Sequence, residues 1–274
     1  MFTLNYLEHS PRVTLLQLLL KDEYPLTIDG IFGPKTQAAL KAFQASRSKV
    51  PTGIANPETW QDLLAGTGLA VVSSVDLGDP RLEDDAQLLR EAGDDPIEIG
   101  GMCNGLGQLV SSVSARAEGK KIAALRLDGH GNLGRWLTIS VGDVVDMSPQ
   151  DYAETAKEYY SYVDPAHFAT VSPLLGRLTP KFARFGFAEH HGCSLGKQPA
   201  TRKMLAKLAN LWGVPFSVGV EKQPVGAVTF FKGPVFTAFP HGMNLRSWSH
   251  QFQKTTVRTM SMAPTSSSSL RYMR

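Results

Sequence analysis

The pattern of apolar and polar positions begins with three short amphipathic segments. Residues 13–20 are apolar at helical spacing. Residues 30–40 and 53–63 are two copies of one pattern, offset by 23 positions. In each copy a turn glycine precedes a capping residue, Gly33 or Asn56, and a proline then occupies the first helical position, where its missing N–H costs nothing. We therefore predict a compact unit of three helices with short connections.

Further along the chain the pattern changes to strands that alternate with helices. Short apolar runs end at glycine-rich turns, and longer amphipathic runs with caps lie between them. This alternation favours a mainly parallel sheet with helices on both faces. We expect strands at 121–127, 136–141, 183–189 and 214–220, helices at 107–117, 148–160 and 199–212, and a hairpin at 229–239.

These patterns predict a multidomain chain in which a small all-α module precedes an α/β domain. The helical module takes residues 1–66, and the α/β domain takes residues 101–252. Gly, Asp and Pro dominate residues 67–100, which we interpret as an acidic linker with one short helix. Residues 253–274 are basic and rich in serine, and we expect them to form a flexible tail.

The overall composition excludes several classes of protein. The 274 residues are 42% hydrophobic and 19% charged, which is ordinary for a globular chain and unlike a mainly disordered, collagen-like or disulfide-scaffold protein. No apolar run is long enough for a transmembrane helix. The N-terminus lacks the features of a cleavable signal peptide, so export to the periplasm or cell wall would need another route.

The net charge of +3 hides an uneven distribution of charge. Residues 76–98 are strongly acidic, whereas residues after Glu221 include no acid and several Lys and Arg. A basic end can contact nucleic acid, anionic lipid or an acidic wall polymer. The alternative is a solubilising surface with a flexible end. The sequence contains no nucleic-acid-binding fingerprint, so we expect no nucleic-acid partner.

The helical module resembles the peptidoglycan-binding domain of the PG_binding_1 type over residues 11–64. The resemblance rests on Asp29-Gly30-Ile31-Phe32-Gly33-Pro34, Thr36, Ala39-Leu40, Phe43-Gln44, Gly53 and Thr59-Trp60. It implies that a shallow groove between helices holds the glycan or stem peptide of peptidoglycan. The stretch between the two repeats departs from the family, because Arg47 and Lys49 make it basic where a hydrophobic Gly-Leu is common.

Two predicted strands of the α/β domain end in small-residue turns that carry reactive side chains. His130 stands between Gly129 and Gly131, and Cys193 follows Gly192. Glycine lets the backbone turn sharply and leaves the neighbouring side chain exposed. Because ligands of parallel sheets bind outside the carboxyl ends of the strands, both turns are candidates for one site.

The chemistry of this pair is that of a cysteine nucleophile with a histidine base. An unassisted thiol has a pKa of about 8.5, so an imidazole that accepts its proton raises the thiolate population. The backbone N–H groups of Gly131 and Cys193 are candidates for an oxyanion hole. Asp128 stands two residues before His130 and either orients the imidazole or caps a turn. The helix that begins at Pro199 could further favour negative charge on sulfur.

This arrangement resembles the caspase–hemoglobinase-like fold of clan CD cysteine peptidases, and more closely the DUF4347-type domains. The match covers residues 122–130 and 185–220. It implies that His130 is the general base and Cys193 the nucleophile in acyl transfer, acting on a peptide or amide bond without a cofactor. Glu189 and His191 would line the pocket, and they replace the small or apolar residues that relatives carry there.

Structural roles compete with each of these assignments. His130 could be a loop histidine that bonds to backbone, and Cys193 an inert, half-buried thiol. A zinc site could combine both with His190 and His191, although adjacent histidines on an extended strand project in opposite directions.

Outside this constellation, Cys103 is expected to be a packed thiol, and His241 and His250 to be surface residues. Three hypotheses follow. The first is a wall-targeted cysteine hydrolase, the second a non-catalytic wall-binding adaptor with a caspase-like pseudoenzyme domain, and the third a zinc amidase.

Overall fold

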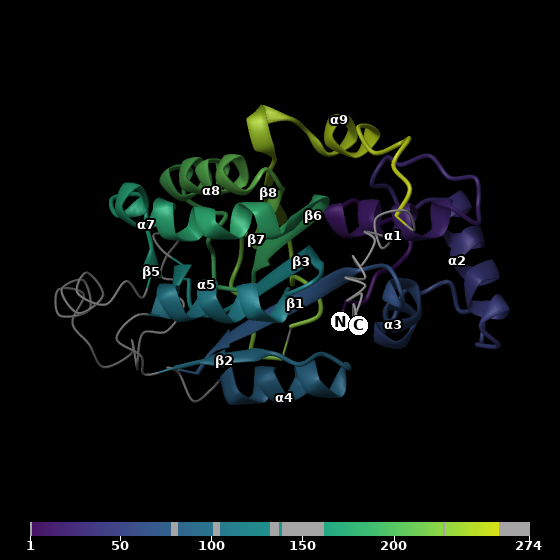
Figure 1. The fold of residues 1–274 in the computed structure, drawn as a ribbon, viewed down its shortest axis with the longest axis horizontal. Helices are drawn as coiled ribbons and strands as arrows, with labels where there is room; N and C mark the ends of the chain where they lie inside the picture. Colours follow the sequence, from purple (N-terminus) through teal and green to yellow (C-terminus); the bar gives the residue numbers. More distant parts are fainter. Residues whose placement is uncertain are drawn as a thin grey trace, which may run out of the picture.

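A computed structural model describes residues 2–77, 82–100, 105–131, 137–138, 162–226 and 228–257. The helical module comes first along the chain, and the α/β domain follows it (Figure 1). The helices are α1 (Pro11–Lys21), α2 (Pro34–Ser46), α3 (Pro57–Leu64), α4 (Glu83–Glu91), α5 (Gly105–Arg116), α7 (Phe168–Leu175), η2 (Gly176–Lys181), α8 (Pro199–Trp212), η3 (Pro240–Gly242) and α9 (Leu245–His250). The strands are β1 (Leu69–Asp76), β2 (Ile97–Ile99), β3 (Lys121–Asp128), β4 (Leu137–Thr138), β5 (Tyr162–Val163), β6 (Phe182–His190), β7 (Phe216–Gly219) and β8 (Val235–Ala238).

The three helices of the module form where the caps and prolines predict them. The Ser10 side chain accepts a hydrogen bond from the Val13 N–H at the start of α1, and Asn56 does the same for Thr59 at the start of α3. Each helix has a proline in its first turn. Local signals therefore define this module, and the predicted helical fold of this region is confirmed.

The α/β domain is built on a six-stranded sheet with the order β2-β1-β3-β6-β7-β8. All neighbouring pairs are parallel except β7 and β8, which are antiparallel. The prediction of a mainly parallel sheet is confirmed. Because β3 and β6 are direct neighbours and run in the same direction, their carboxyl ends lie side by side at one edge of the sheet.

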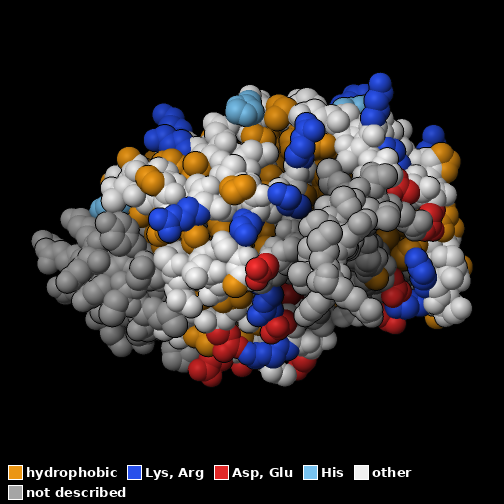
Figure 2. All heavy atoms as spheres, in the orientation of Figure 1, with side chains coloured by type: hydrophobic (Ala, Val, Ile, Leu, Met, Phe, Trp, Pro, Cys, Tyr) orange, Lys and Arg blue, Asp and Glu red, His pale blue; other side chains and the backbone are white. Residues whose placement is uncertain are grey.

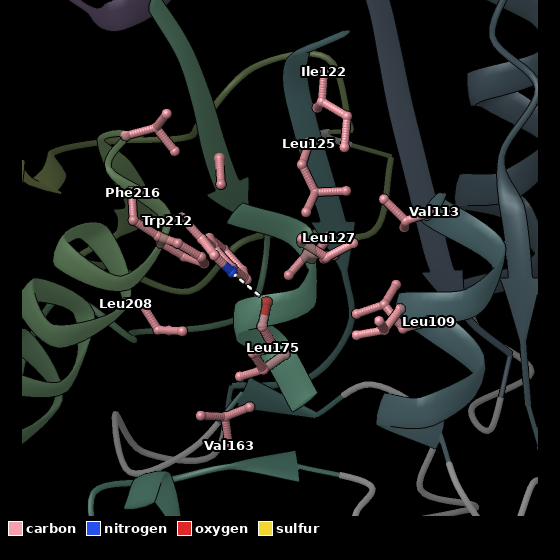
Figure 3. Packing of buried hydrophobic residues seen from close by; sticks show 14 of the residues in the cluster. Leu109, Val113, Ile122, Leu125, Leu127, Val163, Leu175, Leu208, Trp212 and Phe216 are labelled. Carbon is pink, nitrogen blue, oxygen red and sulfur yellow. Dashed lines mark hydrogen bonds between the residues drawn. The ribbon is translucent and has the colours of Figure 1, made fainter. Parts of the chain in front are cut away.

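One face of the sheet is covered by α5, α7, η2 and α8. Figure 3 shows how Leu109 of α5, Leu127 of β3 and Trp212 of α8 meet in this apolar layer. The indole N–H of Trp212 donates a hydrogen bond of 2.9 Å to the carbonyl oxygen of Leu175. The polar atom of a large buried side chain is thereby satisfied.

The helical module covers much of the other face, beside α4. One continuous cluster contains Leu16 of α1, Trp60 of α3, Phe187 of β6 and Trp248 of α9. The hydroxyls of Thr14 and Ser249 also lie 2.7 Å apart across this seam. The module therefore occupies the place of a covering layer of the sheet, and it shares a core with the α/β domain.

The segment predicted to be an acidic linker is instead part of the sheet. Residues 67–100 contain β1 and β2, which pair in parallel, and α4 between them. The apolar run Leu69–Asp76 is the strand beside β3. Three of the acidic residues that suggested a linker, Glu83, Asp84 and Glu91, are exposed on α4, while Leu89 of the same helix is fully buried.

Two other expectations require correction. The hairpin predicted at 229–239 is a single strand, β8, which pairs with β7 across the loop at 220–234. The predicted flexible tail begins with ordered residues, because Val257 is buried and Gln253 accepts a hydrogen bond of 2.8 Å from the Ile28 N–H. The predicted helix at 148–160, Cys103, residues 258–274 and most of the strand predicted at 136–141 lie outside the described residues.

Candidate functional site

The turns that follow β3 and β6 contact each other through their backbones. A Cβ atom built on Gly131 would lie 2.3 Å from the carbonyl oxygen of Cys193 and 2.9 Å from its nitrogen. A Cβ atom on Gly192 would lie 2.8 Å from the Gly131 nitrogen. The close approach of the two turns therefore requires glycine at both positions. His130 and Cys193 are both half-buried on these adjoining turns.

The loop after β7 fixes the turn that carries the cysteine. The N–H groups of Ser194 and Gly196 donate to the carbonyl oxygens of Glu221 and Gly219, each at 2.9 Å. The Cys193 thiol itself donates to the carbonyl oxygen of Gln223 at 3.5 Å. These contacts hold the sulfur beside residues 219–223.

Gln223 organises that loop. Its side-chain NH₂ donates to the carbonyl oxygens of Glu221 and Lys232, at 3.0 and 3.1 Å, and its amide oxygen accepts from the Lys232 N–H at 2.9 Å. A buried amide that makes three hydrogen bonds rigidifies the segment it joins. Sequence analysis did not single out this residue, because an isolated glutamine in a loop has no distinctive signal.

A buried ion network joins the module to the strand that leads to Cys193. Arg12 of α1 binds Glu189 of β6 in bidentate fashion, with its Nε 2.9 Å from Oε2 and its Nη2 2.9 Å from Oε1. Arg126 of β3 donates from Nε to the same Oε1 at 3.1 Å, and its Nη1 lies 3.6 Å from an oxygen of Asp94. Glu189 and Arg126 are at most 1% exposed, so the pairing replaces the hydration that both charges lose.

Aromatic rings complete the surroundings of this network. The guanidinium carbons of Arg12 and Arg126 lie 4.8 and 4.6 Å from the centroid of the Phe2 ring. The ring of His191 stacks on Phe231, with 4.3 Å between centroids. Phe2 therefore gives both cations a cation–π contact in a desolvated place.

Burial and charge act in opposite directions on the titratable groups of the network. Burial raises the pKa of Glu189, but Arg12, His191 and Arg126 outweigh burial and hold that pKa far below its usual range. Burial lowers the pKa of His191, against the attraction of Glu189. We therefore assign an ionised Glu189 beside a neutral His191 at neutral pH.

Asp128, at the end of β3, is paired with a second carboxyl group. Its side chain forms a hydrogen bond with Asp85 of α4, which also accepts from the Gly226 N–H at 2.5 Å. Burial first, and then the nearby Asp85, raise the pKa of Asp128 well above its usual value, and burial also raises the pKa of Asp85. The two carboxyls therefore share a proton, which links β3 to α4.

The predicted pocket residues occupy places that differ from the expectation. Glu189 lines a pocket of about 270 Å³, but this pocket lies at the seam between the module and the sheet, with Glu8, Arg12 and Phe231 among its other lining residues. His191 is buried against Phe231 and lies 3.2 Å from an oxygen of Glu189. Both residues thus belong to the network that holds the module.

The histidines around Cys193 have separate environments. His190 accepts a hydrogen bond from the Gly192 N–H at its Nδ1, with a length of 2.8 Å, whereas His191 faces Glu189 and Phe231. Within the described part of the chain, no three His, Cys, Asp or Glu side chains are grouped as metal ligands. His241 and His250 are exposed, as predicted.

Sequence analysis missed Arg12 and Arg126, although both carried a signal. Arg126 interrupts an otherwise apolar strand, and Glu189 does the same in β6. A charge at an inward strand position requires a partner of opposite sign. That signal indicates a buried pair, but it does not reveal that a third member comes from a helix 177 residues away.

A second pocket lies within the helical module, between the end of α1, the end of α2 and α3. Its volume is about 300 Å³. Its walls combine apolar side chains with charges of both signs, and the side chains that line it include Leu19, Asp22, Glu23, Phe43, Arg47, Asp62, Leu63 and Val257. A pocket therefore lies between the helices of the module, with Val257 from near the other end of the chain in its wall.

Comparison with protein families identifies the module. Residues 9–63 match the family described as putative peptidoglycan binding domain. This part of the chain is therefore similar to peptidoglycan-binding domains. Curated proteins and solved structures give no match to the chain. Among the described residues, every helix is too short or too polar to cross a lipid bilayer.

Proposed function

We propose that the protein is a peptidoglycan-targeted cysteine hydrolase of the peptidase or amidase type. The observation that carries the proposal is the backbone contact between the turn with His130 and the turn with Cys193, at the adjoining carboxyl ends of β3 and β6. This is the edge of a parallel sheet at which ligands bind. The peptidoglycan-binding module supplies the targeting.

In the proposed reaction, His130 takes the proton of Cys193, and Sγ attacks the carbonyl carbon of an amide. A carbon–sulfur bond forms while the carbonyl oxygen becomes an oxyanion, for which the N–H groups of Gly131 and Cys193 are the candidate donors. The carbon–nitrogen bond then breaks, and the amine leaves with the proton from His130. A water molecule, deprotonated by His130, hydrolyses the thioester and releases a carboxylic acid and the free thiol.

The wall ligand would bind in the 300 Å³ groove of the module. Arg47 lies over the ring of Phe43, with its guanidinium carbon 5.2 Å from the centroid, and the acidic side chains of Asp22, Glu23 and Asp62 also line the groove. Stem peptides carry both ammonium and carboxylate groups, so a groove with charges of both signs suits them. Arg47 and Lys49, which depart from the family pattern, have separate roles: Arg47 lines the groove, and Lys49 bridges Glu58 and Asp62 at 2.8 Å each.

Thiol labelling tests the catalytic half of the proposal. The rate of alkylation of Cys193 by iodoacetamide is followed by peptide mass spectrometry in the full chain, with Cys103 as the internal reference. We expect Cys193 to react faster than Cys103, and we expect His130→Ala to remove the difference. The release of amines from purified peptidoglycan should be lost in Cys193→Ala. Equal slow labelling of both thiols, unchanged by His130→Ala, would contradict the proposal.

Sedimentation with purified peptidoglycan tests the binding half. Arg47→Ala should weaken co-sedimentation of the full chain, whereas Lys35→Ala, an exposed change on α2 outside the groove, should leave it unchanged. If both variants sediment like the unmodified chain, the groove does not bind the wall.

A non-catalytic adaptor is the second candidate. One observation favours it: the Cys193 thiol donates to the carbonyl oxygen of Gln223, and only the neutral thiol can make this bond. In an adaptor, the same turn would serve recognition. Normal wall binding together with an unreactive Cys193 would favour the adaptor over the hydrolase.

A further inference from the structure

The surface formed by η2 and α8 has an unusual charge composition. Residues 165–220 contain seven Lys or Arg residues and a single acid, Glu189, which is 1% exposed. Six of these cations lie on η2, on α8 or in the turn before α8, and we call them the cationic face: Arg177, Lys181, Lys197, Arg202, Lys203 and Lys207. The surface contributed by this stretch of chain is therefore positive without compensation.

The two elements form one continuous surface. The Thr179 hydroxyl of η2 donates to the carbonyl oxygen of Leu211 in α8 at 2.8 Å. Lys203 and Lys207 stand four positions apart on α8, so their Cα atoms are about 6 Å apart along one side of the helix. Cations at this spacing on a rigid helix can contact neighbouring charges of one polymer.

The described residues offer these cations no carboxylate partner. Arg202 donates to the carbonyl oxygen of Gly196 at 2.6 Å, and Lys207 lies 5.6 Å from the centroid of the Phe168 ring. Within the described ranges, none of the six forms an ion pair. By contrast, two exposed cations on the neighbouring helices α4 and α5 are paired: Arg90 with Glu98, and Arg116 with Asp95 at 2.5 Å.

A group of acidic side chains lies on the other side of the sheet, on α4 and in the segment after it. Glu83, Asp84 and Glu91 are exposed on α4, and Asp95 and Glu98 follow it. Figure 2 shows Lys and Arg side chains over the α8 part of the molecule and Asp and Glu gathered over the α4 part. This separation of charge orients the protein in the field of a polyanion, with the cationic face toward it.

We infer that the cationic face binds an anionic phosphodiester polymer of the cell wall. The inference rests on the proposed wall location, because the peptidoglycan-binding module brings this face close to polymers attached to the wall. Repeated phosphates would contact successive cations of α8 and η2 and release their counterions, so binding would depend strongly on salt. The polymer contact would add to the module's own binding as a second, linked attachment.

Co-sedimentation of the full chain with two kinds of sacculi tests this. One kind is Gram-positive sacculi that retain teichoic acid, and the other is the same material after hydrofluoric acid has removed it. The face variant Lys197→Gln/Lys203→Gln/Lys207→Gln should bind the first kind about 10- to 100-fold more weakly at low salt, given the usual attraction per Lys at an anionic surface. Its slope of log K against log salt should be shallower by about two.

The matched control lowers the net charge by the same three units. It carries Lys35→Gln/Arg246→Gln/Lys254→Gln, at exposed positions outside the cationic face, and it should bind both kinds like the unmodified chain. On stripped sacculi the face variant should also equal the unmodified chain. Equal weakening by both triple variants, or no weakening by the face variant, would overturn the inference.

Two further outcomes separate this inference from its alternatives. If duplex DNA binds the face as tightly as the wall polymer does at the same salt, the surface is a general polyanion site and the inference fails. If stripped sacculi do not bind even the unmodified chain, the proposal that the module's groove binds peptidoglycan is wrong. The comparison of the face variant with its control on polymer-bearing sacculi still tests the cationic face in that case.

Discussion

Replacing Glu189 with glutamine removes the charge on which the contact between module and sheet depends. The carboxylate receives two donors from Arg12 and one from Arg126, and it is 1% exposed. Glutamine keeps the shape but leaves Arg12 and Arg126, both buried, without the carboxylate that they share. Breaking a buried pair by removing one partner costs about 3–5 kcal/mol, which is a large part of the 5–15 kcal/mol typical of a whole domain.

Equilibrium unfolding in urea, followed by tryptophan fluorescence and circular dichroism, measures this loss. The control is Glu58→Gln, which removes a surface partner of Lys49; the Glu58 side chain is 65% exposed. Because surface ion pairs contribute about 0–1 kcal/mol, the control should lose no more than that amount of stability. Adding Arg12→Met to Glu189→Gln should recover part of the loss, because the buried guanidinium that made two hydrogen bonds to Glu189 is then gone.

The pH dependence of the same measurement gives a second check. The folded-state pKa of Glu189 lies below its ordinary value of 4.5. Its contribution is therefore fully present above pH 4.5 and is lost as the pH falls further. The stability difference between the unmodified chain and Glu189→Gln should shrink on acidification. A loss below 1 kcal/mol at pH 7, or a difference that grows toward acid, would refute the reasoning.

Three further outcomes are expected from the same unfolding assay. Gly131→Ala places a Cβ 2.3 Å from the carbonyl oxygen of Cys193 and should lower the free energy of unfolding by about 1–3 kcal/mol. In the control Gly176→Ala, the atom nearest to the new Cβ would be 3.5 Å away, so stability should be unchanged or slightly higher. Burial and the nearby Asp85 raise the folded pKa of Asp128 well above 3.8, so the contribution of this group to stability should fall as the pH rises above 3.8, and Asp128→Asn should abolish that trend. Trp248→Ala, at a side chain 1% exposed, should cost about 3–5 kcal/mol and unfold the module together with the sheet; an unchanged midpoint would contradict the shared core.

The parts of the fold that local rules define could be predicted from the sequence. Proline and cap positions set the starts of α2 and α3, and Gly213, at a φ of 68°, ends α8 as expected. The apolar runs that became β3 and β6, and the glycine turns after them, placed His130 and Cys193 at the same edge of the sheet. Each of these signals involves residues close together in the sequence.

The contacts that the sequence did not reveal join distant segments. β1 was hidden because acidic residues follow it, although its own eight residues are almost entirely buried. The module contacts the sheet in part through an ion pair between Arg12 and Glu189. The spacing of apolar residues along the chain does not predict such a pairing. Glu189 was predicted to line a pocket, and it does line one at the seam between module and sheet, but the sequence did not reveal its partners, the cations of Arg12 and Arg126.

For the proposed hydrolase, the shared core between the module and the sheet would limit which bonds of the wall can be reached. An enzyme on a flexible tether sweeps a volume around its anchor and meets bonds at many distances. Here one continuous apolar cluster joins the proposed anchor to the sheet that carries the candidate thiol, so the distance between the two would vary little. Once bound to the wall, such a protein would reach only those bonds that lie at this one distance from the site where the module binds.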